Sequence, residues 1–319
     1  INYNSHAWST MVVANIGTGA GSGSTWSFGG YLNANVNYYN PKVTSDNTTY
    51  TSATYVYMTS SFDSAGTTRY TSRFLLVTSP FTTSPTYTYR QPGSPSGFWW
   101  QSNGLSPNAY LHQDICYYNT GTVDRVYTVY NHAGTATNKN VYIAWSNDYG
   151  VTVGSGNTLT LTESTDIQGA ICAANGGTSR QTMAIGYRLL FSLFDWDYRI
   201  QYSPSGGTTS GVFTGQYIEY TSDTTLLISL QAVDLANGRF VTGSARNGGE
   251  HYYRSFNGTT LGTPFQTNNI TGDVSYGGCR AGYWNSPNPD SCVVVWSPNL
   301  GSGALCSRLI CSTVGIQNN

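Results

Sequence analysis

Asp114-Ile-Cys-Tyr-Tyr118 and Arg125-Val-Tyr-Thr-Val-Tyr130 flank a glycine-containing turn, and Val141-Tyr-Ile-Ala-Trp145 follows after a loop. Apolar and polar residues alternate with a period of two in these segments, as half-buried strands require. The stretch therefore predicts a hairpin and a third strand, closed by a turn at Ser146-Asn-Asp-Tyr-Gly-Val-Thr-Val153.

The same unit recurs along the chain, and such internal repeats decide the architecture. In five predicted hairpins a Gly-containing turn is followed by an arginine that opens the next strand. These turns are Asp63 to Arg69, Asn119 to Arg125, Asn175 to Arg180, Asp234 to Arg239 and Tyr276 to Arg280. A third strand follows each hairpin, as at Tyr198 to Tyr202, and a weaker fourth strand often comes next, as at Leu159 to Thr162.

Six four-stranded units of about 53 residues predict an all-β chain folded as one six-bladed β-propeller over residues 1–319. The expected blades are roughly 1–51, 52–108, 109–166, 167–223, 224–271 and 272–319, with the third strand Asn35 to Tyr39 in the first. Five or seven blades, or a pair of β-sandwiches, are alternative architectures.

The composition excludes some classes of protein. Only 9% of the residues are charged and the net charge is -1, so the basic patch of a nucleic-acid-binding protein is missing. No membrane-length apolar run or signal peptide occurs. We therefore expect a mature extracellular chain, secreted or held at a cell surface, that begins at Ile1.

The six cysteines predict up to three disulfides in an oxidising compartment. A bridge between Cys306 and Cys311 across the last strand is one candidate, and the connectivity is otherwise open. The sequons Asn47-Thr-Thr, Asn257-Gly-Thr and Asn269-Ile-Thr predict a glycoprotein in a host that glycosylates.

Ser146-Asn-Asp-Tyr-Gly-Val-Thr-Val153 resembles the Asp box of sialidase-like propellers, S-x-D-x-G-x-T-W, and differs only in the closing Trp. Ser203-Pro-Ser-Gly-Gly-Thr-Thr209 is a weaker copy. The resemblance implies a turn between the third and fourth strands of a blade. We expect Asp148 to stabilise that turn, since Asp favours turns.

Sialidase activity is not implied, because the early Arg-Ile-Pro motif of that family is absent and the first arginine is Arg69. The length and the Arg-Val-Tyr opening at Arg125 are also similar to six-bladed fucose-binding lectins. The Glu that recurs beside the Arg in those lectins is not repeated here.

Ten of the fifteen acidic residues, Glu163 among them, lie in or beside the loops at one end of the predicted sheets, and the other five lie in turns at the opposite end. Two carboxylates at suitable separation cleave glycosidic bonds, so Asp195, Asp197, Glu250 and His251 are the candidate catalytic residues if the protein is an enzyme. Asp195 and Asp197 are also weak candidates for a Ca²⁺ site. The simpler interpretation is that these acids decorate solvated loops.

Aromatic and cationic side chains are the candidate ligand-binding residues, because aromatic faces stack on the C–H surfaces of sugars. They are Trp99, Trp100, Arg125, Arg180, Trp196, Arg239, Arg246 and Trp284. The repeated arginines have a structural alternative, in which each pairs with the turn of its own blade.

These observations favour an extracellular glycan-binding, lectin-like propeller with weak sites and affinity raised by multivalency. A glycoside hydrolase or polysaccharide lyase acting at the acidic loops is one alternative. A self-assembling surface or filament subunit is another, and an oligomer is compatible with each. Cell-surface or extracellular glycans are the expected partners.

Overall fold

The computed structural model describes strands and short connections distributed over the whole chain. The described residues are 11–15, 26–31, 36–45, 55–64, 67–78, 86–90, 100–101, 111–119, 124–132, 139–148, 158–177, 180–192, 195–207, 213–219, 224–234, 239–246, 251–266, 280–284, 291–296 and 306–311. Every regular element in these ranges is a β-strand, which confirms the all-β class.

The chain divides into two compact units. Unit 1 comprises Ile1–Tyr117, Asp124–Ala136 and Tyr142–Thr158, and unit 2 comprises Tyr118–Val123, Thr137–Val141 and Leu159–Asn319. The boundary falls within the strands of one sheet, whose order is β11-β10-β9-β8. Its strands are β8 (Leu111–Asn119), β9 (Asp124–His132), β10 (Asn140–Ser146) and β11 (Thr158–Thr162).

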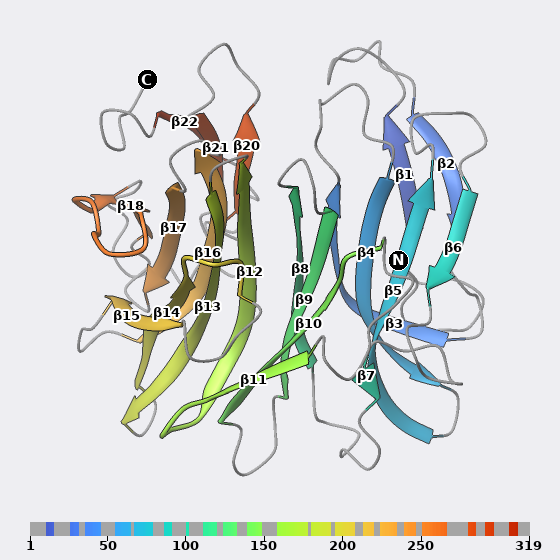
Figure 1. Cartoon of the computed structure of the whole chain (residues 1–319), viewed down its shortest axis with the longest axis horizontal. Helices are drawn as coiled ribbons and strands as arrows, with labels where there is room; N and C mark the ends of the chain where they lie inside the picture. The colour runs from blue at the N-terminus through green and yellow to red at the C-terminus, as the bar shows by residue number, and fades with distance from the viewer. Residues whose placement is uncertain are drawn as a thin grey trace. The chain divides into compact units, whose positions relative to one another are not determined.

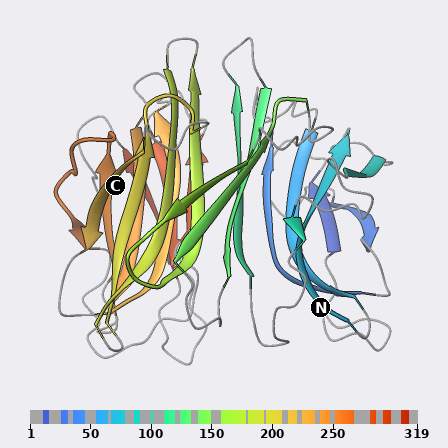
Figure 2. The ribbon, with the colours of Figure 1, turned by 60° about the horizontal axis from the view of Figure 1, so that its bottom comes forward.

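Unit 2 contains three further sheets in chain order (Figures 1 and 2). The first comprises β12 (Ile167–Gly177), β13 (Arg180–Ser192), β14 (Asp195–Ser203) and β15 (Thr214–Glu219). The second comprises β16 (Thr225–Asp234), β17 (Arg239–Arg246), β18 (His251–Phe256) and β19 (Phe265–Gln266). The third comprises β20 (Arg280–Trp284), β21 (Ser291–Trp296) and β22 (Cys306–Cys311). The first strands of neighbouring sheets lie together, β12 against β16 and β16 against β20.

An aromatic core joins the first two of these sheets. One face of β14 contributes Tyr198 and Ile200, and the facing sheet contributes Phe240 and Phe256, all 1% exposed or less. The Tyr198 hydroxyl donates a hydrogen bond to the Ser229 carbonyl oxygen at 3.1 Å. The packing between these sheets is therefore mainly apolar and includes a buried hydrogen bond.

Unit 1 also contains two further sheets. Their strands are β1 (Met11–Asn15), β2 (Trp26–Tyr31), β3 (Val36–Ser45), β4 (Tyr55–Ser64), β5 (Thr67–Thr78), β6 (Thr86–Arg90) and β7 (Trp100–Gln101). Tyr57 stacks on Tyr117 with ring centroids 5.6 Å apart. Ile115, Val126 and Ala144 complete that buried cluster.

The four-stranded antiparallel sheets support a β-propeller. Three sheets of the described part, β8–β11, β12–β15 and β16–β19, have four strands each. The hairpins that close on Arg125, Arg180 and Arg239 occur as β8–β9, β12–β13 and β16–β17. No helix in the described ranges is long and apolar enough to cross a membrane.

The strand order differs from the sequence expectation at the N-terminal end. Residues 35–39 were expected to complete the first blade, but β3 pairs with β4 instead, in the order β3-β4-β5-β6. Ser45 pairs with Val56, and this register is invisible in the alternation of either strand. The boundary expected at residue 51 therefore does not separate two sheets.

The expected Cys306–Cys311 bridge is wrong. Both residues lie in the extended strand β22, at its two ends, and five steps of about 3.3 Å separate their Cα atoms by about 16 Å. A disulfide needs Cα atoms within about 7 Å. Cys116 and Cys172 are buried, and the number of disulfides and their connectivity stay predictions.

Candidate functional site

The predicted catalytic and metal-binding acids Asp195 and Asp197 lie at the start of β14. The register pairs Asp197 with Leu189, and Asp197 is only 2% exposed. The half-buried Asp195 accepts a hydrogen bond from the Thr224 hydroxyl at 3.4 Å. Burial of Asp197 is unfavourable for a residue that must contact a polysaccharide.

No metal site is found near these acids in the part of the chain that the structure describes. There, no three His, Cys, Asp or Glu side chains gather in a group that could hold a metal ion. Ca²⁺ takes six to eight oxygen ligands, which two carboxylates on one strand do not supply. Calcium at Asp195 and Asp197 stays a prediction.

Trp196, a predicted sugar-stacking residue, is half-buried beneath an arginine. The Arg188 guanidinium carbon lies 5.6 Å from the Trp196 ring centroid. Arg188 donates from Nη2 to Gln168 Oε1 at 2.6 Å and from Nη1 to the Thr225 carbonyl oxygen at 3.3 Å. Burial lowers the pKa of Arg188 from its usual value. These contacts tie β12, β13 and β14 to β16, which favours a structural role.

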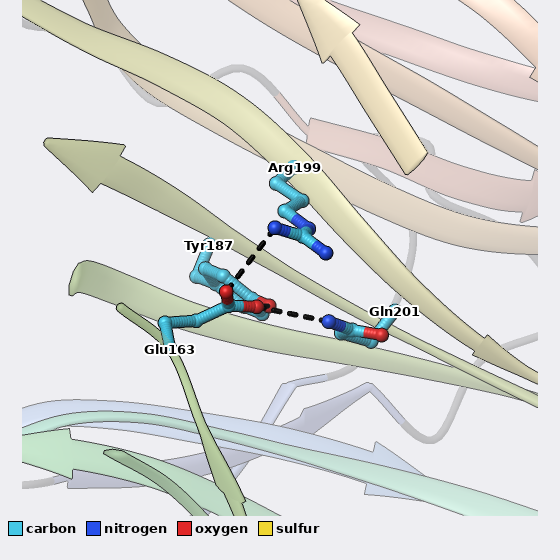
Figure 3. Close-up of polar contacts among 4 residues, drawn as sticks. All are labelled: Glu163, Tyr187, Arg199 and Gln201. Atoms are coloured by element: carbon cyan, nitrogen blue, oxygen red, sulfur yellow. Dashed lines mark hydrogen bonds and ion pairs between the residues drawn. The ribbon is translucent and has the colours of Figure 1, made fainter. Parts of the chain in front are cut away.

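Figure 3 shows a second polar cluster in unit 2, on the other face of the β12–β15 sheet. Glu163 follows β11, and its amide donates to the Lys139 carbonyl oxygen at 2.8 Å. Its carboxylate accepts hydrogen bonds from the Tyr187 hydroxyl, from Gln201 Nε2 at 2.9 Å and from Arg199 Nη1 at 3.1 Å. Both carboxylate oxygens thus accept from neighbouring side chains.

Strand register explains why these side chains meet. Tyr187 on β13 and Tyr217 on β15 both pair with Arg199 on β14, and directly paired residues share a face. Gln201 lies on the same face two residues further along β14. A row of side chains therefore crosses three strands, from Tyr187 through Arg199 to Tyr217.

The inner end of this row is buried and neutral. Tyr187 is fully buried, and desolvation raises its pKa far above the usual value, assisted by the hydrogen bond to Glu163 and the charge of Glu163. The Tyr187 hydroxyl therefore remains a donor at physiological pH. It holds the Glu163 carboxylate in place and is excluded as a general base.

The outer end of the row is open. Tyr217 is 39% exposed, and the Arg199 guanidinium carbon lies 5.3 Å from its ring centroid. The Arg199 side chain is 24% exposed, whereas that of Glu163 is 8% exposed. A side chain at Gly215 would place its Cβ 2.3 Å from Arg199 Nη2, so the glycine makes room for the guanidinium.

Arg199 has N–H donors without an acceptor among the residues that the structure describes. A guanidinium carries five N–H donors. The hydrogen bond that Arg199 makes within the described residues is the one from Nη1 to Glu163, and its buried Nε has no acceptor there. We call Glu163, Tyr187, Arg199, Gln201 and Tyr217 the Arg199 site. It offers an aromatic face beside hydrogen-bond donors.

Arg125 and Arg246 are the predicted ligand-binding arginines whose side chains the structure describes. Arg125 donates from Nε to Asn147 Oδ1 at 2.6 Å and from Nη1 to the Tyr127 hydroxyl at 3.1 Å. This arginine therefore braces the turn after β10, which supports its structural alternative. Arg246 ends β17 and lies 4.3 Å from the Tyr252 ring centroid.

For the other predicted site residues, the structure describes at most the strand and not the side chain. Arg180 opens β13, Arg239 opens β17, His251 opens β18, Trp100 opens β7 and Trp284 ends β20. Trp99 and Glu250 lie outside the described residues altogether. Their roles as ligand-binding or catalytic groups stay predictions.

The turn expected at Asp148 follows the third strand of its sheet. Ser146 Oγ donates to Asp148 Oδ1 at 2.6 Å and accepts from the Asp148 amide at 3.3 Å. After β14, Ser203 Oγ accepts from the Gly207 amide at 2.9 Å. A serine that ends the third strand thus organises both turns.

The sequence interpretation missed the Arg199 site. Glu163 was counted among the loop acids, and residues 198–202 were recognised only as a third strand. The alternation of Arg199 and Gln201 with Tyr198 and Ile200 was a usable signal, because it assigns charged and apolar residues to opposite faces. The partner of Arg199 could not be found this way, since Glu163 is 36 residues away in sequence.

Comparisons with known proteins show a similarity in fold, but they do not assign the chain to a family. No protein-family model and no curated protein matches the chain. An alpha-L-arabinanase from Penicillium chrysogenum, solved in complex with arabinobiose, has 12% sequence identity to this chain and a TM-score of 0.57. The match covers 90% of this chain and 81% of the arabinanase chain. At this identity the similarity concerns the fold alone.

Other solved structures are more distant. The fucose-recognising Aleuria aurantia lectin, described as a six-bladed beta-propeller, has 12% identity, covers 88% of this chain and 77% of its own, and has a TM-score of 0.48. The NanB sialidase from Streptococcus pneumoniae has 15% identity and a TM-score of 0.42, and the match covers 71% of this chain and 32% of the sialidase chain. Similarities this distant carry no argument about the chemistry of this chain.

Proposed function

We propose that the protein is a secreted, lectin-like β-propeller that binds glycans at the Arg199 site. One observation carries the proposal: the exposed ring of Tyr217 lies beside the Arg199 guanidinium, which Glu163 holds in place. An aromatic ring stacks on the apolar C–H face of a sugar, and spare N–H donors bind its hydroxyl oxygens.

The site is suited to binding without chemical change. Glu163 is nearly buried and both of its oxygens already accept hydrogen bonds. Tyr187 is held protonated by burial and by its bond to Glu163. Neither side chain is placed to exchange a proton with a substrate, so recognition is the activity that the geometry supports.

The architecture belongs to the proposal as well. Six blades in one domain over residues 1–319 remain our interpretation of the repeats. The sheets β8–β11, β12–β15 and β16–β19 fall inside the blades expected at 109–166, 167–223 and 224–271, which supports it. Affinity raised by several weak sites is a further part of the proposal.

The test is a glycan array on the purified protein and on a Tyr217→Ala variant. Removal of the ring should lower affinity for each bound glycan by about fivefold, since an aromatic contact contributes about 1 kcal/mol. Phe191→Ala is the matched control, because Phe191 is also exposed, at 57%, and lies near the end of β13. Equal binding by the wild type and Tyr217→Ala would contradict the proposal.

The enzyme alternative is read out in the same experiment. Its candidate residues remain Asp195, Asp197, Glu250 and His251, and the fold shared with an arabinanase is compatible with it. Release of reducing ends from a bound glycan would identify a hydrolase, and release of unsaturated products a lyase. Binding without either product supports the lectin-like function.

A further inference from the structure

The charge of the Arg199 site is already balanced. The Arg199 guanidinium forms an ion pair with Glu163 at 3.1 Å, and the carboxylate is 8% exposed. Asp197 lies two residues before Arg199 on β14, in register for the same face. Among the described residues, this face therefore carries two carboxyl groups and one guanidinium, without an excess of positive charge.

The remaining hydrogen-bonding capacity of the site consists of donors. Glu163 Oε1 accepts from Tyr187 and Gln201, and Oε2 accepts from Arg199. Among the described residues, the groups left over are the Nη N–H donors of Arg199 that do not bind Glu163, beside the exposed Tyr217 ring. A sugar hydroxyl or ring oxygen accepts from such a donor without bringing a charge into the site.

We infer, on the basis of the proposed glycan-binding function, that the Arg199 site selects neutral sugars and rejects acidic ones. A uronic-acid carboxylate or a sulfate ester would be attracted by Arg199 but repelled by Glu163 and Asp197. Because the ion pair is partly buried, this repulsion is screened less than between surface charges. The Glu163 carboxylate is therefore a specificity-determining group that acts through Arg199.

The experiment measures affinity for pairs of oligosaccharides that differ in one charge. A galactose disaccharide and the same disaccharide with one residue oxidised to galacturonic acid are one such pair, offered to the wild type and to Glu163→Gln by calorimetry. The wild type should bind the preferred neutral member of a pair at least about tenfold more tightly than its acidic counterpart. Its affinity for the neutral sugar should be unchanged when salt is raised.

Glu163→Gln should largely abolish this preference. The amide keeps an acceptor oxygen near Arg199 but removes the negative charge, so affinity for the acidic sugar should rise about tenfold. That gain should shrink in high salt, since it comes from a newly uncompensated charge. An unchanged ratio of acidic to neutral affinity in a folded Glu163→Gln protein would overturn the inference.

Arg199→Lys is a second test of the inference, which applies even if Glu163→Gln does not fold. Lysine keeps the positive charge opposite Glu163 but loses the planar fork of donors. Neutral-sugar affinity should fall about tenfold, with no gain for the acidic sugar. Undiminished neutral-sugar binding by Arg199→Lys would overturn the assignment of those donors.

The outcomes separate this inference from the proposed function. A wild-type protein that binds uronic-acid or sulfated glycans more tightly than neutral ones would overturn the neutral-sugar inference and leave the glycan-binding function standing. A wild-type protein that binds neither class across the array would overturn the proposed function, and the inference with it.

Discussion

Replacement of Gly258 by Ala should destabilise unit 2, because that glycine lies under an aromatic ring in a backbone conformation that other residues avoid. Gly258 has φ of 97° in the turn after β18. The turn is held by Asn257 Oδ1, which accepts from the Thr260 amide at 2.8 Å. A Cβ at Gly258 would lie 2.2 Å from Cε1 of Tyr202 on β14.

The magnitude follows from two separable costs. Positive φ costs an alanine about 1 to 2 kcal/mol. Tyr202 must also move, and it forms edge-to-face pairs with Phe240 at 6.2 Å and Phe256 at 5.7 Å, each worth about 0.5 to 1.5 kcal/mol. We expect a loss of about 3 kcal/mol in the free energy of unfolding, or about 4 °C in Tm for a chain of 319 residues that unfolds cooperatively.

The assay is thermal and urea unfolding followed by circular dichroism. Gly262→Ala is the matched control in the same turn, because its Cβ would meet the Ser255 hydroxyl oxygen at 2.3 Å, and that hydroxyl can rotate away. We expect a much smaller loss for Gly262→Ala than for Gly258→Ala.

A double-mutant cycle tests the cause. In a Tyr202→Ala background the ring is absent, so Gly258→Ala should cost only the backbone term of about 1 to 2 kcal/mol. An equal cost in both backgrounds would refute the steric contact between Gly258 and Tyr202. A Tm within 1 °C of the wild type for Gly258→Ala, about the scatter of such comparisons, would refute the reasoning altogether.

Three further predictions concern single side chains. Asp148→Ala removes the hydrogen bond with Ser146 and should cost about 1 kcal/mol in urea unfolding, with glycan binding retained; lost binding at unchanged stability would contradict the turn assignment. Arg188→Ala breaks the ties to Gln168 and Thr225 and should cost about 2 kcal/mol in the same assay; a neutral result would remove its bracing role. The pKa of Tyr187 is raised in the folded state, so its contribution to the free energy of unfolding is fully present below about pH 10 and is lost by about 1.4 kcal/mol per pH unit as pH rises toward the folded value. The free energy of unfolding of Tyr187→Phe should therefore fall less steeply with alkaline pH, and identical slopes for the two proteins would count against burial of this hydroxyl.

The strands and hairpins were predictable from sequence because their signals are local. Alternation with a period of two marked residues 141–145 and 198–202 as third strands, and both are strands in the structure. Turn chemistry likewise marked Ser146 and Asp148, whose hydrogen bonds span two residues. Such features depend on neighbours along the chain and need no knowledge of the sheet.

Pairing and burial were decided by the tertiary structure. The alternation of β3 does not say that β4 is its partner, and a D-x-D motif does not say that Asp197 is 2% exposed. The Arg199 site is the clearest case, since Glu163 meets Tyr187 and Arg199 only after β13 and β14 have taken their register. A strand's alternation fixes which side chains share a face, but only non-local pairing and the packing of sheets determine what that face meets.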